Sequence, residues 1–149
     1  MSGSHHILLY DGACGLCHRS ARYVLRHDDE AIFRFAPLQS ELASMLLEKH
    51  EITNWTMSTL YVIRRGEGGD AVVLDRSRAV FFILGEVGGG WAWVRIFRIF
   101  PTALTNLVYR GISRVRYRLF GRLKSCPLPS EEHRGRFLGT SEAQTLQDQ

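Results

Sequence analysis

The spacing of apolar and polar residues predicts alternating strands and helices along the first half of the chain. Residues 7–10 form a short apolar run that ends at an Asp-Gly pair, which is typical of a buried strand followed by a turn. From Cys17 onward, apolar residues recur at i, i+4, i+7 and i+8, which predicts an amphipathic helix. Residues 31–36 predict a second strand, and a proline separates it from a second helix through residues 38–47.

The next part of the chain predicts a β-hairpin and a third helix. Residues 59–64 and 71–74 are rich in β-branched residues and are joined by a glycine-rich loop, and residues 79–86 form an apolar helical segment. The resulting order is βαβ, helix, ββα. We therefore expect an α/β protein with a thioredoxin-like fold and additional C-terminal helices.

A further amphipathic helix is predicted after Pro101. Its apolar residues follow helical spacing at positions 104, 108, 112, 115 and 119. We expect this stripe to pack on the core, while Arg110, Arg114 and Arg118 form an i, i+4 ladder on another face. Residues 139–149 have almost no apolar anchor, so we expect a single domain over residues 1–138 and a flexible tail.

Charge is distributed unevenly along the 149 residues, of which 45% are hydrophobic and 23% are charged. Residues 87–130 contain no Asp or Glu and carry a formal charge of +8, whereas the rest of the chain, with 11 basic and 15 acidic residues, sums to −4. The segment Arg95–Lys124 is therefore a candidate contact for an anionic surface or protein partner, although no nucleic acid is expected. We find neither a membrane-spanning stretch nor a secretory signal pattern and expect a cytoplasmic protein.

The residues Cys14-Gly15-Leu16-Cys17 stand where the first strand gives way to the first helix. This spacing brings two sulfurs together across one helical turn, and a thiolate at the helix N-terminus is favoured by the helix dipole and by free N–H groups. We expect an accessible Cys14 to attack a substrate disulfide and a more buried Cys17 to resolve the mixed disulfide. Gly15 and Leu16, between them, are candidate substrate contacts.

Asp11 stands three residues before Cys14, at the end of the first strand. Its carboxylate is a candidate proton acceptor for Cys17 during resolution. An Asp that hydrogen-bonds to backbone N–H groups of its own turn is an equally good interpretation, and both roles are compatible.

The Cys pair also matches two kinds of metal-containing site. Cys17 followed by His18 also matches a haem attachment site, but no exported context accompanies it. A structural zinc site needs four ligands, and the sequence offers no second closely spaced pair to complement Cys14 and Cys17. We therefore expect neither a metal nor a cofactor. Cys126 is a candidate third redox thiol or a small buried residue.

The chain resembles the DCC family of predicted thiol-disulfide oxidoreductases, at D-G-A-C-G-L-C, at F-A-P-L-Q-S-E and at R-Y-R-L-F-G. The resemblance implies a thioredoxin-like fold and redox roles for Asp11, Cys14 and Cys17. Thioredoxin-like proteins usually carry a cis-proline before the third strand, whereas this chain has Ser58 there, which is a candidate substrate contact. Gln39 opens the second helix, where it is a candidate substrate contact or part of the helix start.

Two functions follow from the sequence. The first is a thiol-disulfide oxidoreductase in which Cys14 and Cys17 act on a disulfide- or dithiol-containing protein or small molecule. The alternative is a non-enzymatic binding module, in which the basic C-terminal segment contacts an anionic membrane or a protein and the Cys pair is structural or binds zinc.

Overall fold

The predicted strands and helices all occur in the protein. The computed structural model describes residues 5–56, 59–66, 68–87, 93, 96–97, 99–121 and 135–138. Their elements follow the order β1 (His6–Tyr10), α1 (Gly15–His27), β2 (Phe33–Pro37), α2 (Glu41–Lys49), β3 (Tyr61–Arg65), β4 (Ala71–Asp75), α3 (Arg76–Val87) and α4 (Thr102–Phe120).

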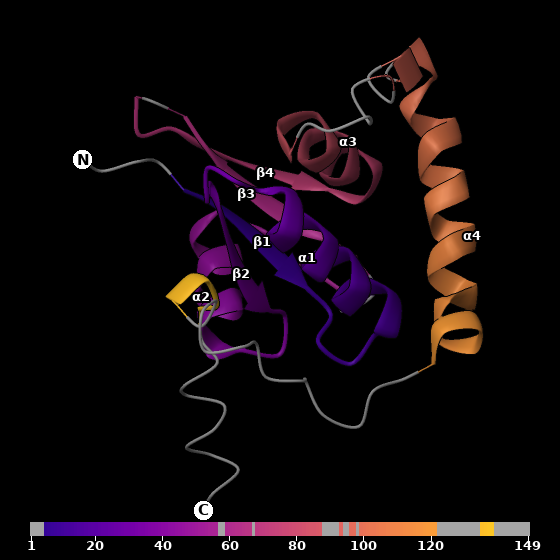
Figure 1. Ribbon diagram of the computed structural model, residues 1–149, viewed down its shortest axis with the longest axis horizontal. Helices are drawn as coiled ribbons and strands as arrows, with labels where there is room; N and C mark the ends of the chain where they lie inside the picture. The colour runs from indigo at the N-terminus through magenta and orange to yellow at the C-terminus, as the bar shows by residue number, and fades with distance from the viewer. Residues whose placement is uncertain are drawn as a thin grey trace, which may run out of the picture.

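The four strands form one mixed sheet in the order β2-β1-β3-β4. β1 runs parallel to β2 and antiparallel to β3, and β4 pairs antiparallel with β3. On β1, Leu8 stands opposite Phe35 of β2 and Val62 of β3. This topology is consistent with the thioredoxin-like fold that the order of elements predicted, and Figure 1 shows the sheet with its helices.

Alternation of side chains along the central strand builds a core on each face of the sheet. Leu8 and Tyr10 of β1 belong to the cluster formed with α1 and α3, whereas Ile7 and Leu9 belong to the cluster formed with α2. All four side chains are buried. The carboxyl end of β1, where the Cys pair begins, is therefore fixed between two packed layers.

α4 stands beside the sheet and contacts α1 and α3 (Figure 1). Our prediction that its apolar stripe packs on the core is wrong, because Leu104, Val108, Ile112, Val115 and Leu119 are 42–71% exposed. The face that meets the rest of the protein is polar and repeats at helical spacing, at Thr105, Tyr109, Ser113 and Arg116. Hydrogen bonds fix this face, since Ser77 pairs with Thr105 at 3.1 Å and Leu60 N–H donates to the Tyr109 hydroxyl at 2.9 Å.

Two further expectations concern membrane-spanning helices and the C-terminal tail. No helix among the described ranges is long and apolar enough to cross a membrane. The predicted tail, residues 139–149, lies outside the described residues, so the extent of a single domain stays a prediction.

Candidate active site

The Cys pair lies where the sequence placed it, at the carboxyl end of β1 and the start of α1. Cys14 is the N-cap residue of α1, with extended backbone dihedrals, and its N–H donates to the Asp11 carbonyl at 3.2 Å. The helix proper begins at Gly15, so both cysteines lie at the N-terminus of α1. Both Cys14 and Cys17 are free thiols in this structure.

The exposure of the two cysteines is the reverse of our expectation. Cys14 is 0% exposed, whereas Cys17 is only partly buried. The end of α4 lies against the first turn of α1. Gly15 N–H donates to the Gly121 carbonyl at 3.4 Å, and a Cβ at Gly15 would lie 2.5 Å from the Phe120 carbonyl oxygen. Gly15 therefore permits a backbone contact that closes over the turn.

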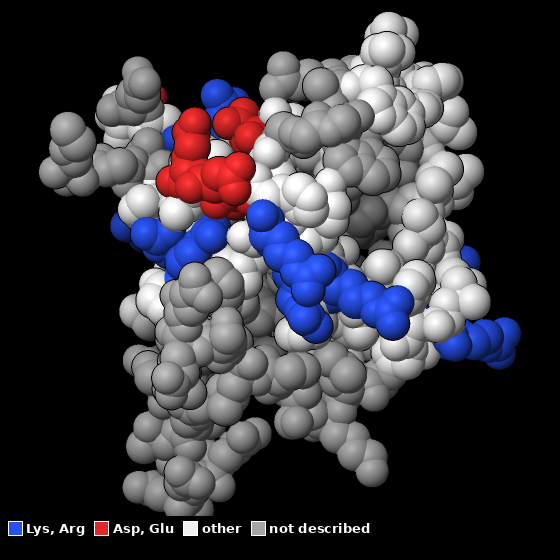
Figure 2. Space-filling model, in the orientation of Figure 1, with Lys and Arg blue, Asp and Glu red and all other residues white. Residues whose placement is uncertain are grey.

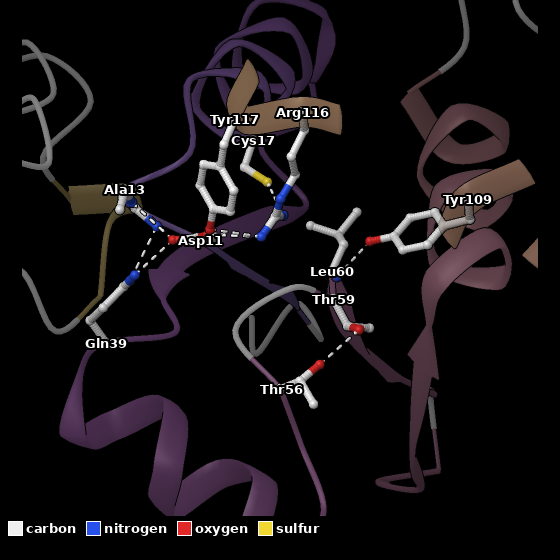
Figure 3. Close-up of polar contacts among 11 residues, drawn as sticks. Asp11, Ala13, Cys17, Gln39, Thr56, Thr59, Leu60, Tyr109, Arg116 and Tyr117 are labelled. Carbon is white, nitrogen blue, oxygen red and sulfur yellow. Dashed lines mark hydrogen bonds and ion pairs between the residues drawn. The ribbon is translucent and has the colours of Figure 1, made fainter. Parts of the chain in front are cut away.

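Asp11 is the centre of a buried hydrogen-bond network (Figure 3). Its Oδ1 accepts the Ala13 N–H at 3.0 Å and the Gln39 side-chain amide at 2.7 Å. Its Oδ2 accepts Arg116 Nη2 at 3.0 Å and the Tyr117 hydroxyl. The carboxylate orders its own turn, as one interpretation predicted, and also holds α4 to that turn.

Arg116 connects the Asp11 network to Cys17. Its Nη1 donates to Cys17 Sγ at 3.3 Å while Nη2 donates to Asp11, and the residue is only 3% exposed. Burial would lower the pKa of Arg116, but the acidic groups around it, with Cys17 the largest contributor and Asp11 among them, raise it, so the guanidinium stays charged. Sequence reasoning included Arg116 only in the basic segment and missed its role at the site.

The surroundings of Cys17 keep its thiol protonated. Burial is the largest cause, and with negative charge on Cys14 it raises the pKa of Cys17 to about 12. Arg116 acts in the opposite direction, because a cation 3.3 Å from the sulfur favours the thiolate. Tyr117 beside it is also held protonated, since burial and its hydrogen bond to Asp11 raise its pKa to about 12.

The remaining predicted site residues divide into those near the turn and those outside the described ranges. The Gln39 side chain is exposed, and its Oε1 accepts the Gly12 N–H at 3.1 Å, so it lies beside the Cys turn. The helix-start role belongs to Ser40, whose hydroxyl accepts the Ala43 N–H at 3.2 Å. Ser58 and Cys126 lie outside the described residues.

Two features bear on the haem and metal alternatives. His18 is half-buried, and burial together with the Arg22 charge lowers its pKa. Within the described ranges, no three His, Cys, Asp or Glu side chains cluster in a way that would hold a metal ion.

An apolar cavity of about 520 Å³ opens beside Cys17, and we call it the Cys17 cavity. Its walls come from α1, α3 and α4, together with Leu60, Phe97 and Phe100. Leu16, one of the predicted substrate contacts, lines it next to Cys17, and Arg116 lines it from α4. Cys14 is not among the residues that line it.

The family described as DCC1-like thiol-disulfide oxidoreductase matches residues 8–122. The chain is 29% identical over 134 residues to the uncharacterized protein YuxK of Bacillus subtilis (strain 168), covering 90% of this chain and 94% of that protein. It is 28% identical over 123 residues to the chloroplastic DCC family protein At1g52590 of Arabidopsis thaliana, covering 82% and 69%. No solved structure matches the chain. Because the family match spans most of its length, the protein belongs to the DCC1-like thiol-disulfide oxidoreductase family.

Proposed function

We propose that the protein is a thiol-disulfide oxidoreductase whose Cys14 and Cys17 cycle between a dithiol and a disulfide. The observation that supports this most directly is the Arg116 guanidinium, which contacts Cys17 Sγ and Asp11 at the start of α1. A buried cation bonded to one sulfur of a closely spaced pair stabilises negative charge that develops there during exchange. The family description supports the same class of reaction.

Cys14 is the proposed nucleophile and Cys17 the resolving thiol. The thiolate of Cys14 attacks a substrate disulfide, forms a mixed disulfide and releases one substrate thiolate. Cys17, protonated at neutral pH because its pKa is raised to about 12, then gives its proton to the released substrate thiolate and attacks the Cys14 sulfur. The second substrate thiolate leaves, and the substrate has gained the two electrons that the Cys pair lost.

Asp11 acts in this scheme as a positioning residue. Four donors to its carboxylate hold the turn and Arg116 in place, and the carboxylate reaches Cys17 through Arg116. A hydrogen bond from the Asp11 backbone also acts on Cys17 and lowers its pKa. Cys14 is fully buried, so attack on a protein disulfide requires the Gly15–Gly121 contact to open.

A redox titration tests the proposal. The protein is equilibrated in thiol/disulfide buffers, and alkylated cysteines are assigned by peptide mapping, which separates Cys126 from the pair. The expected result is one reversible two-electron couple at Cys14 and Cys17, between about −320 and −180 mV. The control is Cys14→Ser, which removes the couple. A wild-type protein without a reversible couple refutes the proposal.

A second candidate function rests on the outer surface of α4. Leu104, Val108 and Ile112 of its apolar stripe line the Cys17 cavity, whereas Val115 and Leu119 lie outside it and are exposed. Arg110, Arg114 and Arg118 are exposed as well. In Figure 2 the acidic side chains lie away from the α4 side of the molecule. An amphipathic helix with an arginine row suits the surface of an anionic membrane, and this role is compatible with the redox function. Arg95, Arg98, Arg122 and Lys124 lie outside the described residues.

A further inference from the structure

The Cys17 cavity has the size and lining of a small-molecule site. Its volume of about 520 Å³ falls within the range of about 300–1,000 Å³ that is usual for ligand pockets. Its walls are largely apolar, with side chains such as Leu16, Phe81, Val108 and Ile112. Among the described residues that line it, Arg116 is the only charged side chain. A ligand of this cavity therefore needs an apolar body, and any negative charge that it carries fits best beside Arg116.

Of the two cysteines, only Cys17 lines the cavity. Cys17 lines this cavity and also a neighbouring one of about 440 Å³, which shares Ser20, Leu60 and Val80 with it. Cys14 lines neither of them and is fully buried. A molecule in the cavity meets Cys17 and does not meet Cys14.

We propose that the Cys17 cavity binds a small apolar thiol, which reduces the Cys14–Cys17 disulfide by attacking Cys17 Sγ; this inference rests on the proposed function. The thiolate forms a bond to Cys17, the Cys14–Cys17 bond breaks, and Cys14 leaves as a thiolate. A second thiolate then attacks the bound thiol's sulfur, and Cys17 leaves and takes up a proton. Two thiols become one disulfide, and the two electrons pass to the Cys pair.

Charge and position favour this direction of attack. Arg116 Nη1 lies 3.3 Å from Cys17 Sγ, so an incoming thiolate approaches a sulfur that is next to a buried cation. The leaving sulfur, Cys14, stands at the N-terminus of α1, where the helix dipole stabilises the thiolate that forms. A hydrophilic thiol reaches the same sulfur but gains nothing from the apolar walls.

The test compares two thiols on oxidised wild-type protein. Rates of disulfide reduction are measured with 1-butanethiol and 2-mercaptoethanol, and each rate is divided by that of the same thiol on oxidised glutathione, which corrects for intrinsic reactivity. The expected normalised preference for 1-butanethiol is about tenfold, because the walls bury its alkyl chain. A preference near one overturns the inference. The redox titration is independent of this outcome, so a reversible couple without any apolar preference refutes only the cavity proposal.

A matched pair of variants connects the preference to the cavity. Val108→Trp fills the cavity, whereas Leu107→Trp adds the same side chain to a neighbouring exposed position of α4 that does not line it. Val108→Trp is expected to reduce the preference about tenfold, and Leu107→Trp to retain it. Equal behaviour of the two variants overturns the proposal.

Trapping the mixed disulfide identifies the sulfur that the thiol attacks. Oxidised wild-type protein is treated with 1-butanethiol, the reaction is stopped with iodoacetamide, and the butylthio group is located by peptide mapping. We expect it on Cys17, with Cys14 alkylated, because only Cys17 lines the cavity. A butylthio group found on Cys14 contradicts the proposed route.

Discussion

Arg116 and Asp11 form an ion pair inside the protein, with Arg116 Nη2 lying 3.0 Å from Asp11 Oδ2 and both side chains almost completely buried. The pair joins residues that are 105 positions apart, one at the end of β1 and one in α4. Removing one member of a buried pair leaves the other charge without compensation, which is strongly destabilising. The stability of the α4 contact and the environment of Cys17 therefore depend on the same two side chains.

Asp11→Asn tests this dependence through stability. The asparagine amide places a donor where Arg116 and Tyr117 both donate, so we expect the free energy of unfolding to fall by about 3–5 kcal/mol, measured by urea denaturation. The control is Asp75→Asn, since Asp75 forms an exposed pair with Arg76 at 3.7 Å and should contribute less than about 1 kcal/mol. Equal losses in the two variants would show that the buried ion pair contributes no more to the free energy of unfolding than the exposed one.

Arg116→Gln tests the electrostatic effect on Cys17. The Cys14→Ser background leaves one thiol of the pair and removes the Cys14 contributions that raise the pKa of Cys17. Since Arg116 lowers the pKa of Cys17, its loss should raise that pKa and decrease the thiolate fraction at any pH below it. We expect the iodoacetamide rate of Cys17 at pH 9 to fall about tenfold, with the pH profile shifted to higher pH.

Arg114→Gln in the same background is the control. Arg114 is exposed on α4, and its replacement removes the same charge from the helix. Its Cys17 profile should coincide with that of Cys14→Ser alone. A profile that Arg116→Gln does not move would mean that Arg116 has only a structural role.

The sequence predicted the elements well, because strand and helix periodicity is a local property. The runs that became β1, α1 and β2 show their burial pattern directly in the order of apolar residues, and the Cys pair follows from its position between two of them. Local pattern was also enough to predict that α4 is a helix.

The contacts of α4 were not predictable in the same way. Its apolar stripe indicated core packing, yet the polar face that carries Tyr109 and Arg116 meets the protein. Arg114, Arg116 and Arg118 look alike in the sequence, and only Arg116 is buried. The difference arises from partners about a hundred positions away, namely Asp11 and Cys17, which no local pattern reveals.

Gly15→Ala tests the contact that covers the Cys turn. An added Cβ would lie 2.5 Å from the Phe120 carbonyl oxygen, so the end of α4 must shift. We expect a loss of about 1–3 kcal/mol in stability and faster alkylation of Cys14 in the native protein. The control is Gly111→Ala in α4, where a Cβ meets no atom within 4 Å and alanine should stabilise the helix by about 0.5–1 kcal/mol. Unchanged Cys14 alkylation in Gly15→Ala would mean that this contact does not limit access.

Vesicle binding tests the proposed membrane surface on α4. The variant that replaces Arg110, Arg114 and Arg118 with Gln should lose binding to vesicles of phosphatidylserine and phosphatidylcholine, measured by sedimentation, because each arginine near an anionic surface contributes about 1 kcal/mol. The matched control replaces Arg19, Arg22 and Arg26, three exposed arginines of α1, and should retain binding although its net charge is the same. Added salt should weaken wild-type binding, since the attraction falls off within the Debye length. Equal binding by the two triple variants would assign the attraction to net charge alone and exclude α4 as the contact surface.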